Sequence, residues 1–303
     1  MRAYEIRGLC KTYPRQEVAA NRDIDLDIEA GEIFVLIGDN GSGKTTLVKQ
    51  MAHLLRPSEG RIRLFGKALD ASPLYTPSLI GFMPQGGNAL DDLTLSEALY
   101  FADHLRGLSR RDARAERDRL VEELGMGAFR DRVIARLSGG QRRLAALATT
   151  LAGSPPILIL DEPTNDLDPQ YRQRVWEILQ TVARDTGATI ILVTHNLVEV
   201  EKLVQRVAVL SAGRVVAQGR PGALKQSMDR QLRLHLAFDP DHPPELPADI
   251  PVREAGRGRW NLRLDRERAG ALLPDLLASE AIEDFHLSTE TLEDFYLWIT
   301  ENP

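Results

Sequence analysis

Short, uninterrupted runs of apolar residues recur along the chain, and turn residues bound each of them. The four clearest runs are Ile33 to Ile37, Ile157 to Leu160, Ile190 to Val193 and Val207 to Leu210. A continuous apolar run indicates a strand buried on both faces, as in a parallel sheet that helices cover. Between the second and third runs, apolar residues recur at helical spacing over 175–182, which predicts a crossover helix. The pattern therefore predicts an α/β fold.

Two further helical regions are predicted in the same part of the chain. Apolar residues recur at helical spacing from Leu47 to Leu55, and Pro57 follows this run. Residues from about 86 to 136 combine apolar positions at helical spacing with a highly charged stretch, Arg110 to Glu123. We therefore expect one helix over 47–55 and a helical insert over 86–136.

The character of the sequence changes near residue 225. Beyond it, apolar and polar residues alternate over 232–238 and over 260–264, which predicts two half-buried strands. A helix over 269–278, a strand over 283–287 and an amphipathic helix over 292–299 follow, with Thr291 as the cap of the last helix. The chain is thus predicted to divide into a large domain, residues 1–225, and a small α+β domain, residues 226–303, with the element order ββαβα.

Composition limits the functions that fit this fold. The net charge is −6, and Lys and Arg are spread along the chain, so no nucleic-acid partner is expected. The single cysteine, Cys10, cannot form an internal disulfide, which favours a reducing compartment. The N-terminus lacks the apolar core of a signal peptide, and every apolar run is far shorter than the ~20 residues that span a bilayer. We therefore expect a cytoplasmic protein whose role at a membrane depends on a partner.

A glycine-rich loop follows the first apolar run, with the sequence Gly38-Asp39-Asn40-Gly41-Ser42-Gly43-Lys44-Thr45. Glycines let backbone N–H groups approach phosphates at a helix N-terminus, Lys44 can reach the β- and γ-phosphates, and Thr45 can offer its hydroxyl to Mg²⁺. A chance glycine-rich turn is the alternative. The loop lies between a predicted strand and a predicted helix, as phosphate binding requires, so we predict a nucleoside triphosphate site here.

Polar residues also follow the second and third apolar runs. Asp161 stands at the carboxyl end of a buried strand, where open α/β sheets bind ligands, and is a candidate ligand of Mg²⁺. Its neighbour Glu162 is the candidate general base that orients and deprotonates the attacking water. His195 follows the third run. A lone histidine is more often structural, but its place in the same row of strand ends favours a contact with the γ-phosphate.

A second anion site is predicted at Leu137-Ser138-Gly139-Gly140-Gln141, where small residues again precede a helical pattern. One such site is enough for a phosphate-loop enzyme that works as a single chain. The duplicate therefore indicates that the γ-phosphate is shared between two chains.

Taken in order, these motifs resemble those of the ABC-type ATPases, and the resemblance covers about residues 1–225. Tyr13 is similar to the aromatic residue that stacks on adenine, although structural packing competes as an explanation for it. Gln85 is similar to the Q-loop glutamine, and His195 to the switch histidine. Leu137 to Gln141 resembles the signature sequence, and Asn165 to Asp168 the D-loop. The implied fold is a P-loop NTPase core with an antiparallel β subdomain and a helical insert.

The resemblance also implies the residues that form the site, with ATP and Mg²⁺ as cofactors. The catalytic residues are Glu162, His195, Gln85 and Lys44. The metal ligands are Thr45, Gln85 and Asp161. The nucleotide contacts are Tyr13, Gly38, Asn40, Gly41, Ser42, Gly43, Lys44, Thr45, Thr46, Ser138, Gly139, Gly140, Gln141 and Asp168. In the family's head-to-tail dimer, each signature sequence covers the phosphate loop of the partner chain.

Three hypotheses describe what such an ATPase does. It powers a separate membrane transporter, or it is a soluble mechanical ATPase that acts on DNA or ribosomes, or it is a small-molecule NTPase or kinase outside the family. Residues 46–136 contain no heptad run, unlike the long coiled coils of the chromosome and DNA-repair relatives. Translation-factor relatives usually fuse two nucleotide domains, whereas this chain has one set of motifs. A kinase leaves residues 137–141 unexplained, so the transporter hypothesis is favoured.

The transporter hypothesis predicts an integral membrane subunit and a second copy of this chain, or a homologous ATPase subunit, as partners. The expected location is peripheral, on the inner face of the cell membrane. The family's membrane contact lies near the Q-loop, so Asn88 to Glu97 is the expected contact segment. Glu290 to Leu297 is similar to the closing segment of the ABC-2-type exporter ATPases, which often carry a small C-terminal domain. The resemblance thus favours export and leaves the substrate open.

Overall fold

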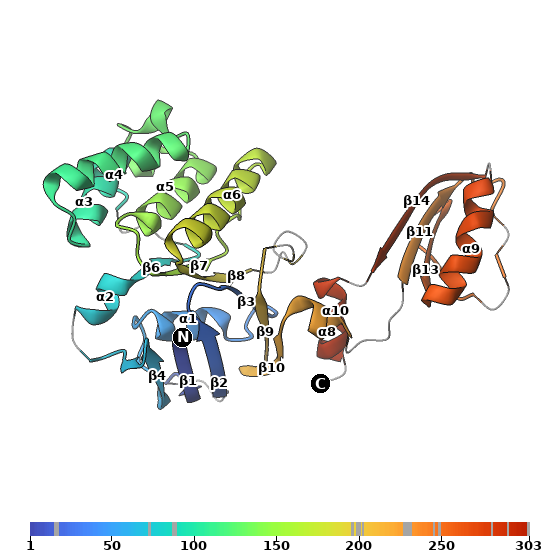
Figure 1. The fold of residues 1–303 in the computed structure, drawn as a ribbon, viewed down its shortest axis with the longest axis horizontal. Coiled ribbons are helices and arrows are strands. Elements are labelled where there is room, and N and C mark those ends of the chain that lie inside the picture. Colours follow the sequence, from blue (N-terminus) through green and yellow to red (C-terminus); the bar gives the residue numbers. More distant parts are fainter. Residues whose placement is uncertain are drawn as a thin grey trace. The chain divides into compact units, whose positions relative to one another are not determined.

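The computed structural model describes residues 1–14, 18–71, 74–86, 90–194, 197, 201, 203–226, 232–244, 246–247, 250–279, 281–289 and 291–301. The chain divides into two compact units, Met1–Arg220 and Pro221–Pro303, whose elements are labelled in Figure 1. Among the helices of the described residues, none combines the length and the apolar character needed to cross a membrane.

A six-stranded sheet forms the centre of the first unit. Its strand order is β10-β9-β3-β8-β7-β6, with all neighbours parallel except β10 and β9. The strands are β3 (Ile33–Ile37), β6 (Ile80–Met83), β7 (Ile157–Asp161), β8 (Thr189–Val193), β9 (Arg206–Ser211) and β10 (Arg214–Gly219). Every residue of β3, β7 and β8 is buried, as continuous apolar runs predict. The α/β fold and the four strands predicted from these runs are confirmed.

The two faces of this sheet are covered differently (Figure 1). Over one face lie α5 (Gly139–Leu151) and α6 (Pro169–Thr186), and α6 is the predicted crossover between β7 and β8. On the other face, α1 (Lys44–Met51) shares one buried core with a second, antiparallel sheet. That sheet has the order β2-β1-β4-β5 and consists of β1 (Arg2–Lys11), β2 (Asn21–Glu29), β4 (Glu59–Leu64) and β5 (Lys67–Ala68). A short helix, α2 (Tyr75–Leu79), leads into β6.

Helix α1 is shorter than the apolar spacing predicts. It ends at Met51, and His53 adopts a left-handed conformation with φ 58°, which takes the chain out of the helix. Leu54 is therefore 64% exposed and does not continue the buried stripe. The prediction that this helix extends to Leu55 is wrong, because local backbone conformation overrides side-chain spacing here.

The helical insert consists of α3 (Leu95–Leu105), α4 (Arg110–Glu123) and two short 3-10 helices, Gly127–Phe129 and Ile134–Arg136. A capping box starts α3: the Glu97 N–H donates to Thr94 Oγ1 (3.2 Å), and the Thr94 N–H donates to the Glu97 carboxylate (2.9 Å). The charged stretch Arg110–Glu123 is largely a solvated face, since α4 buries Ala113, Leu120 and Val121 and leaves most of its charges exposed.

One carboxylate of the insert, Asp103 on α3, is fully buried. Burial raises its pKa to about 6, although the nearby Gly153 N–H and Arg106 guanidinium act in the opposite direction. In the unfolded chain the pKa of an aspartate is close to 4. Between about pH 4 and 6 the folded protein therefore holds a proton that the unfolded chain has lost, so stability falls as the pH rises through this window.

Replacing Asp103 by Asn is expected to increase the free energy of unfolding by about 2–3 kcal/mol near pH 7 and by little near pH 4. The amide has the same shape and carries no charge to bury. Urea unfolding at the two pH values measures the effect. Asp131→Asn is the control, because the Asp131 side chain is 83% exposed and should give no pH-dependent difference. A destabilised Asp103→Asn protein near pH 7 would contradict this account.

The second unit contains an antiparallel sheet with the order β12-β13-β11-β14. Its strands are β11 (Leu232–Phe238), β12 (Val252–Glu254), β13 (Arg259–Leu264) and β14 (Ile282–Thr289), and its helices are α8 (Pro221–Gln226), α9 (Arg266–Ala278) and α10 (Leu292–Glu301). Helix α9 packs on one face of the sheet, over a core that includes Leu234, Leu236 and Leu272. Thr291 caps α10, since its Oγ1 accepts from the Asp294 N–H at 3.2 Å, and this predicted cap is confirmed.

Candidate nucleotide site

A cavity of about 380 Å³ lies at the carboxyl end of the central sheet in the first unit. Segments that are far apart in the sequence meet there, because parallel strands end at the same edge of a sheet. The predicted site residues that line it are Tyr13, Asn40, Gly41, Gly43, Lys44, Thr45, Thr46, Gln85, Asp161 and Glu162. The hydroxyl groups of Tyr13 and Thr46 lie 3.3 Å apart, which connects the aromatic ring to the start of α1.

The loop between β3 and α1 presents a helix N-terminus to this cavity. Gly43 is the N-cap of α1, with φ 102° and no side-chain cap for the first turn. A Cβ at Gly43 would lie 2.1 Å from the carbonyl oxygen of Ala20, so the close approach and the left-handed conformation both require glycine. The N–H groups of the first helical turn lack intrahelical partners and carry a partial positive charge, which suits an anion.

The Lys44 side chain is buried beside this helix end, with 9% of the residue exposed. Its Nζ donates to the carbonyl oxygens of Gly38 (2.7 Å) and Asp39 (2.8 Å). Burial lowers the pKa of Lys44, and the nearby Glu162 and Asp161 counteract this effect. The ammonium group is thus held in place by neutral carbonyl groups, and an entering phosphate would supply the anionic partner that a buried cation needs.

Thr45 and Asp161 also meet at this cavity. Thr45 Oγ1 donates to Asp161 Oδ2 at 3.2 Å, and Asp161 is 2% exposed. Burial raises the pKa of Asp161, while the Thr45 hydrogen bond lowers it. A hydroxyl and a carboxylate are the hard oxygen donors that Mg²⁺ prefers, so these residues fit this metal. Within the described residues no group of three or more His, Cys, Asp or Glu gathers.

Glu162 follows Asp161 directly and is 7% exposed. Its backbone adopts a left-handed conformation with φ 54°, and its N–H donates to the Val193 carbonyl at the end of β8 (2.8 Å). Such a conformation is unfavourable for a side chain with a Cβ and persists where the surroundings enforce it, often at functional sites. The backbone therefore orients Glu162 into the same cavity that Lys44 and Asp161 line.

Arg143 on α5 joins several parts of the site and was missed by sequence reasoning. Its guanidinium group donates to the carbonyl oxygen of Gln85 at 2.9 Å and to those of Asp161 and Glu162. One side chain thus connects the helix after Gly139 to the Gln85 segment and to the end of β7. The sequence offers little signal for this role, because the adjacent Arg142 is the same residue type, yet the structure leaves Arg142 exposed.

The signature residues Ser138, Gly139, Gly140 and Gln141 do not line the cavity of their own chain. Ser138 and Gly139 are exposed at the N-terminus of α5. Ser138 Oγ accepts from the Gln141 N–H (3.3 Å), and the Ser138 N–H donates to Gln141 Oε1 (3.1 Å). The Gln141 side chain therefore completes a capping box. The start of α5 is thus a second helix N-terminus suited to an anion, and it lies outside the cavity of its own chain.

The remaining predicted residues have different surroundings. The carbonyl of Gly38 holds Lys44, Ser42 is buried within the loop, and Gln85 is exposed. Asp168 is exposed as the N-cap of α6 and makes no side-chain cap hydrogen bond. His195 lies outside the described residues, two positions beyond the end of β8.

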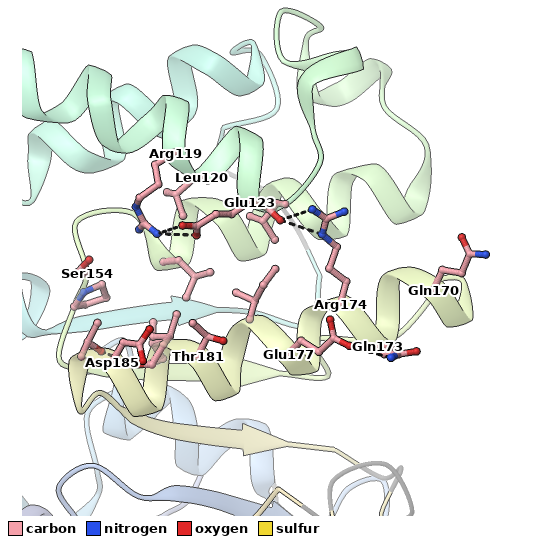
Figure 2. A pocket seen from close by; sticks show the side chains of 17 residues that line it. Arg119, Leu120, Glu123, Ser154, Gln170, Gln173, Arg174, Glu177, Thr181 and Asp185 are labelled. Atoms are coloured by element: carbon pink, nitrogen blue, oxygen red, sulfur yellow. Dashed lines mark hydrogen bonds and ion pairs between the residues drawn. The ribbon is translucent and has the colours of Figure 1, made fainter.

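A second cavity in this unit, of about 710 Å³, lies between α4 and α6 (Figure 2). Leu120, Leu124 and Ile178 contribute to its apolar lining, and the Arg174 guanidinium donates to the Glu123 carbonyl at 3.0 Å between the two helices. Ser154 and Pro155 in its wall precede β7, whereas Asp161 ends this strand. The α4–α6 cavity is therefore at the other end of β7 and is not part of the nucleotide site.

Comparison with known proteins agrees with this geometry. Residues 21–165 match the family model described as ABC transporter. The daunorubicin/doxorubicin resistance ATP-binding protein DrrA of Streptomyces peucetius is 34% identical over 311 residues, covering 100% of this chain and 93% of that protein. The methionine import ATP-binding protein MetN 1 of Burkholderia lata is also 34% identical, over 95% of this chain and 86% of that protein. The dimeric ATP-binding cassette MJ0796, in a post-hydrolysis state bound to ADP and Pi, matches with a TM-score of 0.67 and 26% identity, covering 72% of this chain and 98% of that one.

Proposed function

This chain belongs to the ABC transporter family as an ATP-binding subunit, and we propose that two copies of it hydrolyse ATP between them to drive an integral membrane partner. The cavity that joins Tyr13, Lys44, Asp161 and Glu162 carries this proposal. It combines a helix N-terminus and a buried ammonium group with a carboxylate positioned at the strand end. These are the parts needed to bind a triphosphate and to activate water.

The position of the signature residues supports the proposed dimer. Ser138 and Gly139 form an exposed helix N-terminus outside the cavity of their own chain. A partner chain arranged head to tail would bring this anion site onto the γ-phosphate bound by Lys44. The triphosphate would then stabilise the dimer, and hydrolysis would remove the charge that both sites bind. The relative MJ0796, whose structure is dimeric and holds ADP and Pi, supports a dimer as the working form.

In the proposed mechanism, Glu162 accepts a proton from the attacking water as the water oxygen bonds to the γ-phosphorus. The bond from the γ-phosphorus to the bridging oxygen breaks, and ADP leaves with that oxygen. Lys44 and the N-terminus of α1 stabilise the charge on the phosphates throughout. Thr45 and Asp161 would hold Mg²⁺, which supplies further charge neutralisation when bound. Gln85 and His195 are proposed to contact the metal and the γ-phosphate, and Tyr13 to stack on adenine.

We propose export as the direction of transport. The match to DrrA, a resistance protein by name, covers the whole chain, including the second unit, and the segment 290–297 is similar to that of exporter ATPases. Import by relatives such as MetN 1 is the competing direction. The alternative of a mechanical ATPase on DNA or ribosomes has no support among these relatives.

Purification from native membranes tests this function. A tagged Glu162→Gln chain, solubilised with ATP and mild detergent, is expected to retain an integral membrane protein in fixed stoichiometry. The Lys44→Ala chain is a matched control for ATP dependence, since it should not form the closed dimer. Recovery of ribosomes or DNA without any membrane protein would overturn the proposal.

We further propose that the start of the helical insert contacts the membrane partner. Residues 88 and 89 of the expected contact segment lie outside the described residues, residues 90–94 lead into α3, and residues 95–97 form its first turn. Phe101 and Leu105 on this helix are 45% and 86% exposed. Large apolar side chains exposed together on one helix are typical of an interaction surface.

Replacing Asp92 by Lys together with Phe101 by Glu is expected to reduce transport by about tenfold or more, since the new charges would have to be desolvated in the contact. Basal ATP hydrolysis by the isolated chain should stay within about twofold, because neither residue lines the nucleotide cavity. Transport in vesicles and ATPase rates of the same preparations measure both quantities. Leu54→Glu is the control, as Leu54 is exposed on another part of the unit. Equal transport by both variants, or loss of nucleotide binding, would contradict a coupling role.

A further inference from the structure

The sheet of the second unit has one covered and one open face. Successive residues of a strand point to opposite faces, so Leu234, Leu236 and Leu262 are buried under α9 while their neighbours lie on the other side. In the strand register, Arg233 is opposite Arg263, and His235 is opposite Asn261, which in turn is opposite Arg253 on β12. The open face therefore gathers three arginines, a histidine and an asparagine across three neighbouring strands.

These side chains line a cavity of about 390 Å³. Its other lining residues are Pro251, Val252 and Leu262, so among the residues that the structure describes the wall contains cations and no carboxylate. Like charges directly opposite each other on a sheet are destabilising, and Arg233 and Arg263 form such a pair. Within the described part of the chain, neither Arg253 nor Arg263 takes part in an ion pair. Arg253 and Arg263 thus add positive charge that no ion pair among the described residues neutralises, whereas Arg233 is paired with Asp294.

Two contacts hold part of this cluster in place. Arg233 Nη1 lies 2.5 Å from Asp294 Oδ1 at the start of α10, and the Arg233 Nε is buried without a hydrogen-bond partner among the described residues. The His235 Nδ1 donates to Asn261 Oδ1 at 2.7 Å, which fixes the imidazole ring and leaves the Asn261 amide N–H groups as donors for other partners. Donors that are fixed before binding lose less entropy when a ligand arrives.

A solvated basic surface is the simplest alternative, and arginines on an open sheet face are often only that. Here, however, Arg233, His235 and Asn261 are half-buried around a hollow, and the buried Nε of Arg233 lacks a partner. A surface that only kept the protein soluble would not need this convergence.

We propose that the open face of this sheet is a binding site for a compact phosphate-bearing anion, either a soluble phosphate ester or the headgroup of an anionic lipid. The planar guanidinium groups of Arg253 and Arg263 match pairs of phosphate oxygens, and the Asn261 amide adds neutral donors. The cavity volume is within the range of small-ligand sites. This site is separate from the nucleotide cavity, which lies in the other unit and is lined by other residues.

Calorimetric titration of the full-length chain with inorganic pyrophosphate tests the proposal. The titration uses a Lys44→Ala background, so that the phosphate loop does not compete for the probe. We expect saturable binding that Arg253→Gln with Arg263→Gln weakens by about tenfold or more, since two charge-assisted contacts are lost. The charge-matched control, Arg266→Gln with Arg268→Gln, removes two exposed charges from α9 on the covered side of the sheet and should bind within about twofold of the parent. An unchanged melting temperature shows that the sheet variant is folded. If the double variant is unfolded, the single variant Arg253→Gln, on the edge strand β12, is titrated instead.

Flotation with phosphatidylcholine vesicles, with and without phosphatidylglycerol, identifies the source of the anion. Arginine-dependent flotation only with phosphatidylglycerol assigns the site to a lipid headgroup, whereas pyrophosphate binding without flotation assigns it to a soluble phosphate. Either result supports the proposal. Equal binding by the sheet variant and the α9 control would overturn it. Binding of long oligonucleotides alone, with neither pyrophosphate nor vesicles bound, would also overturn it.

Discussion

Glu162→Gln is expected to reduce the rate of ATP hydrolysis by about 10²–10⁴-fold and to leave ATP bound. The amide keeps the shape of the carboxylate, so the cavity and the left-handed backbone at this residue should be preserved. What it loses is the ability to accept a proton from the attacking water. Because the triphosphate then persists, the dimer should remain closed in the presence of ATP and Mg²⁺.

Single-turnover hydrolysis and size-exclusion chromatography with ATP measure these two effects of Glu162→Gln. Glu122→Gln is the matched control. It removes the same charge from an exposed residue of α4 that does not line the cavity. Its rate should equal that of the unmodified chain. If the Glu162→Gln chain hydrolyses ATP at the normal rate, another group is the base.

Lys44→Ala is expected to weaken ATP binding by about 2–5 kcal/mol, which is the cost of removing one partner of a buried charged contact. The Lys44 ammonium group is held beside the N-terminus of α1 by the carbonyls of Gly38 and Asp39, so it is ordered before the phosphates arrive. Without it, the β- and γ-phosphates would enter a buried site that contains Asp161 and Glu162 and little positive charge.

Calorimetry with ATP measures the effect of Lys44→Ala. The control is Lys49→Ala, on the same helix, because Lys49 is exposed and lies five residues further from the loop. This variant should bind ATP within about twofold of the unmodified chain. Equal affinities of the two variants would mean that Lys44 does not contact the nucleotide.

The buried core of the first unit could be predicted because burial on both faces of a strand produces a local pattern in the sequence. Strands such as β3 and β7 are covered on both faces, so they consist of continuous apolar runs. Strand β1 is different: it mixes charged and apolar residues, and its pairing with β2 has three shifts of register. Bulges of this kind break the period of two, so its bounds could not be predicted from alternation. The resemblance implied an antiparallel subdomain without giving those bounds.

The candidate site was predictable where residue type and strand end coincide, as at Asp161, and not where tertiary contacts decide. Arg142 and Arg143 are identical in the sequence pattern. Only the packing of α5 against the segment of Gln85 and the end of β7 leaves Arg143 half-buried and Arg142 exposed. The end of α1 at Met51 depends in the same way on the left-handed backbone conformation of His53, which side-chain spacing does not encode.

The triphosphate is proposed to be shared by two chains, and mixing two inactive variants tests this sharing most directly. Lys44→Ala disables the phosphate loop, and Ser138→Arg places a bulky cation at the exposed start of α5. Each variant alone should be nearly inactive. In an equal mixture about half of the dimers are mixed, and each of these has one site built from an intact Lys44 and an intact Ser138. We therefore predict recovery of up to about a quarter of the ATPase activity of the unmodified chain. Full activity of Ser138→Arg alone, or a mixture as inactive as its components, would contradict the shared site.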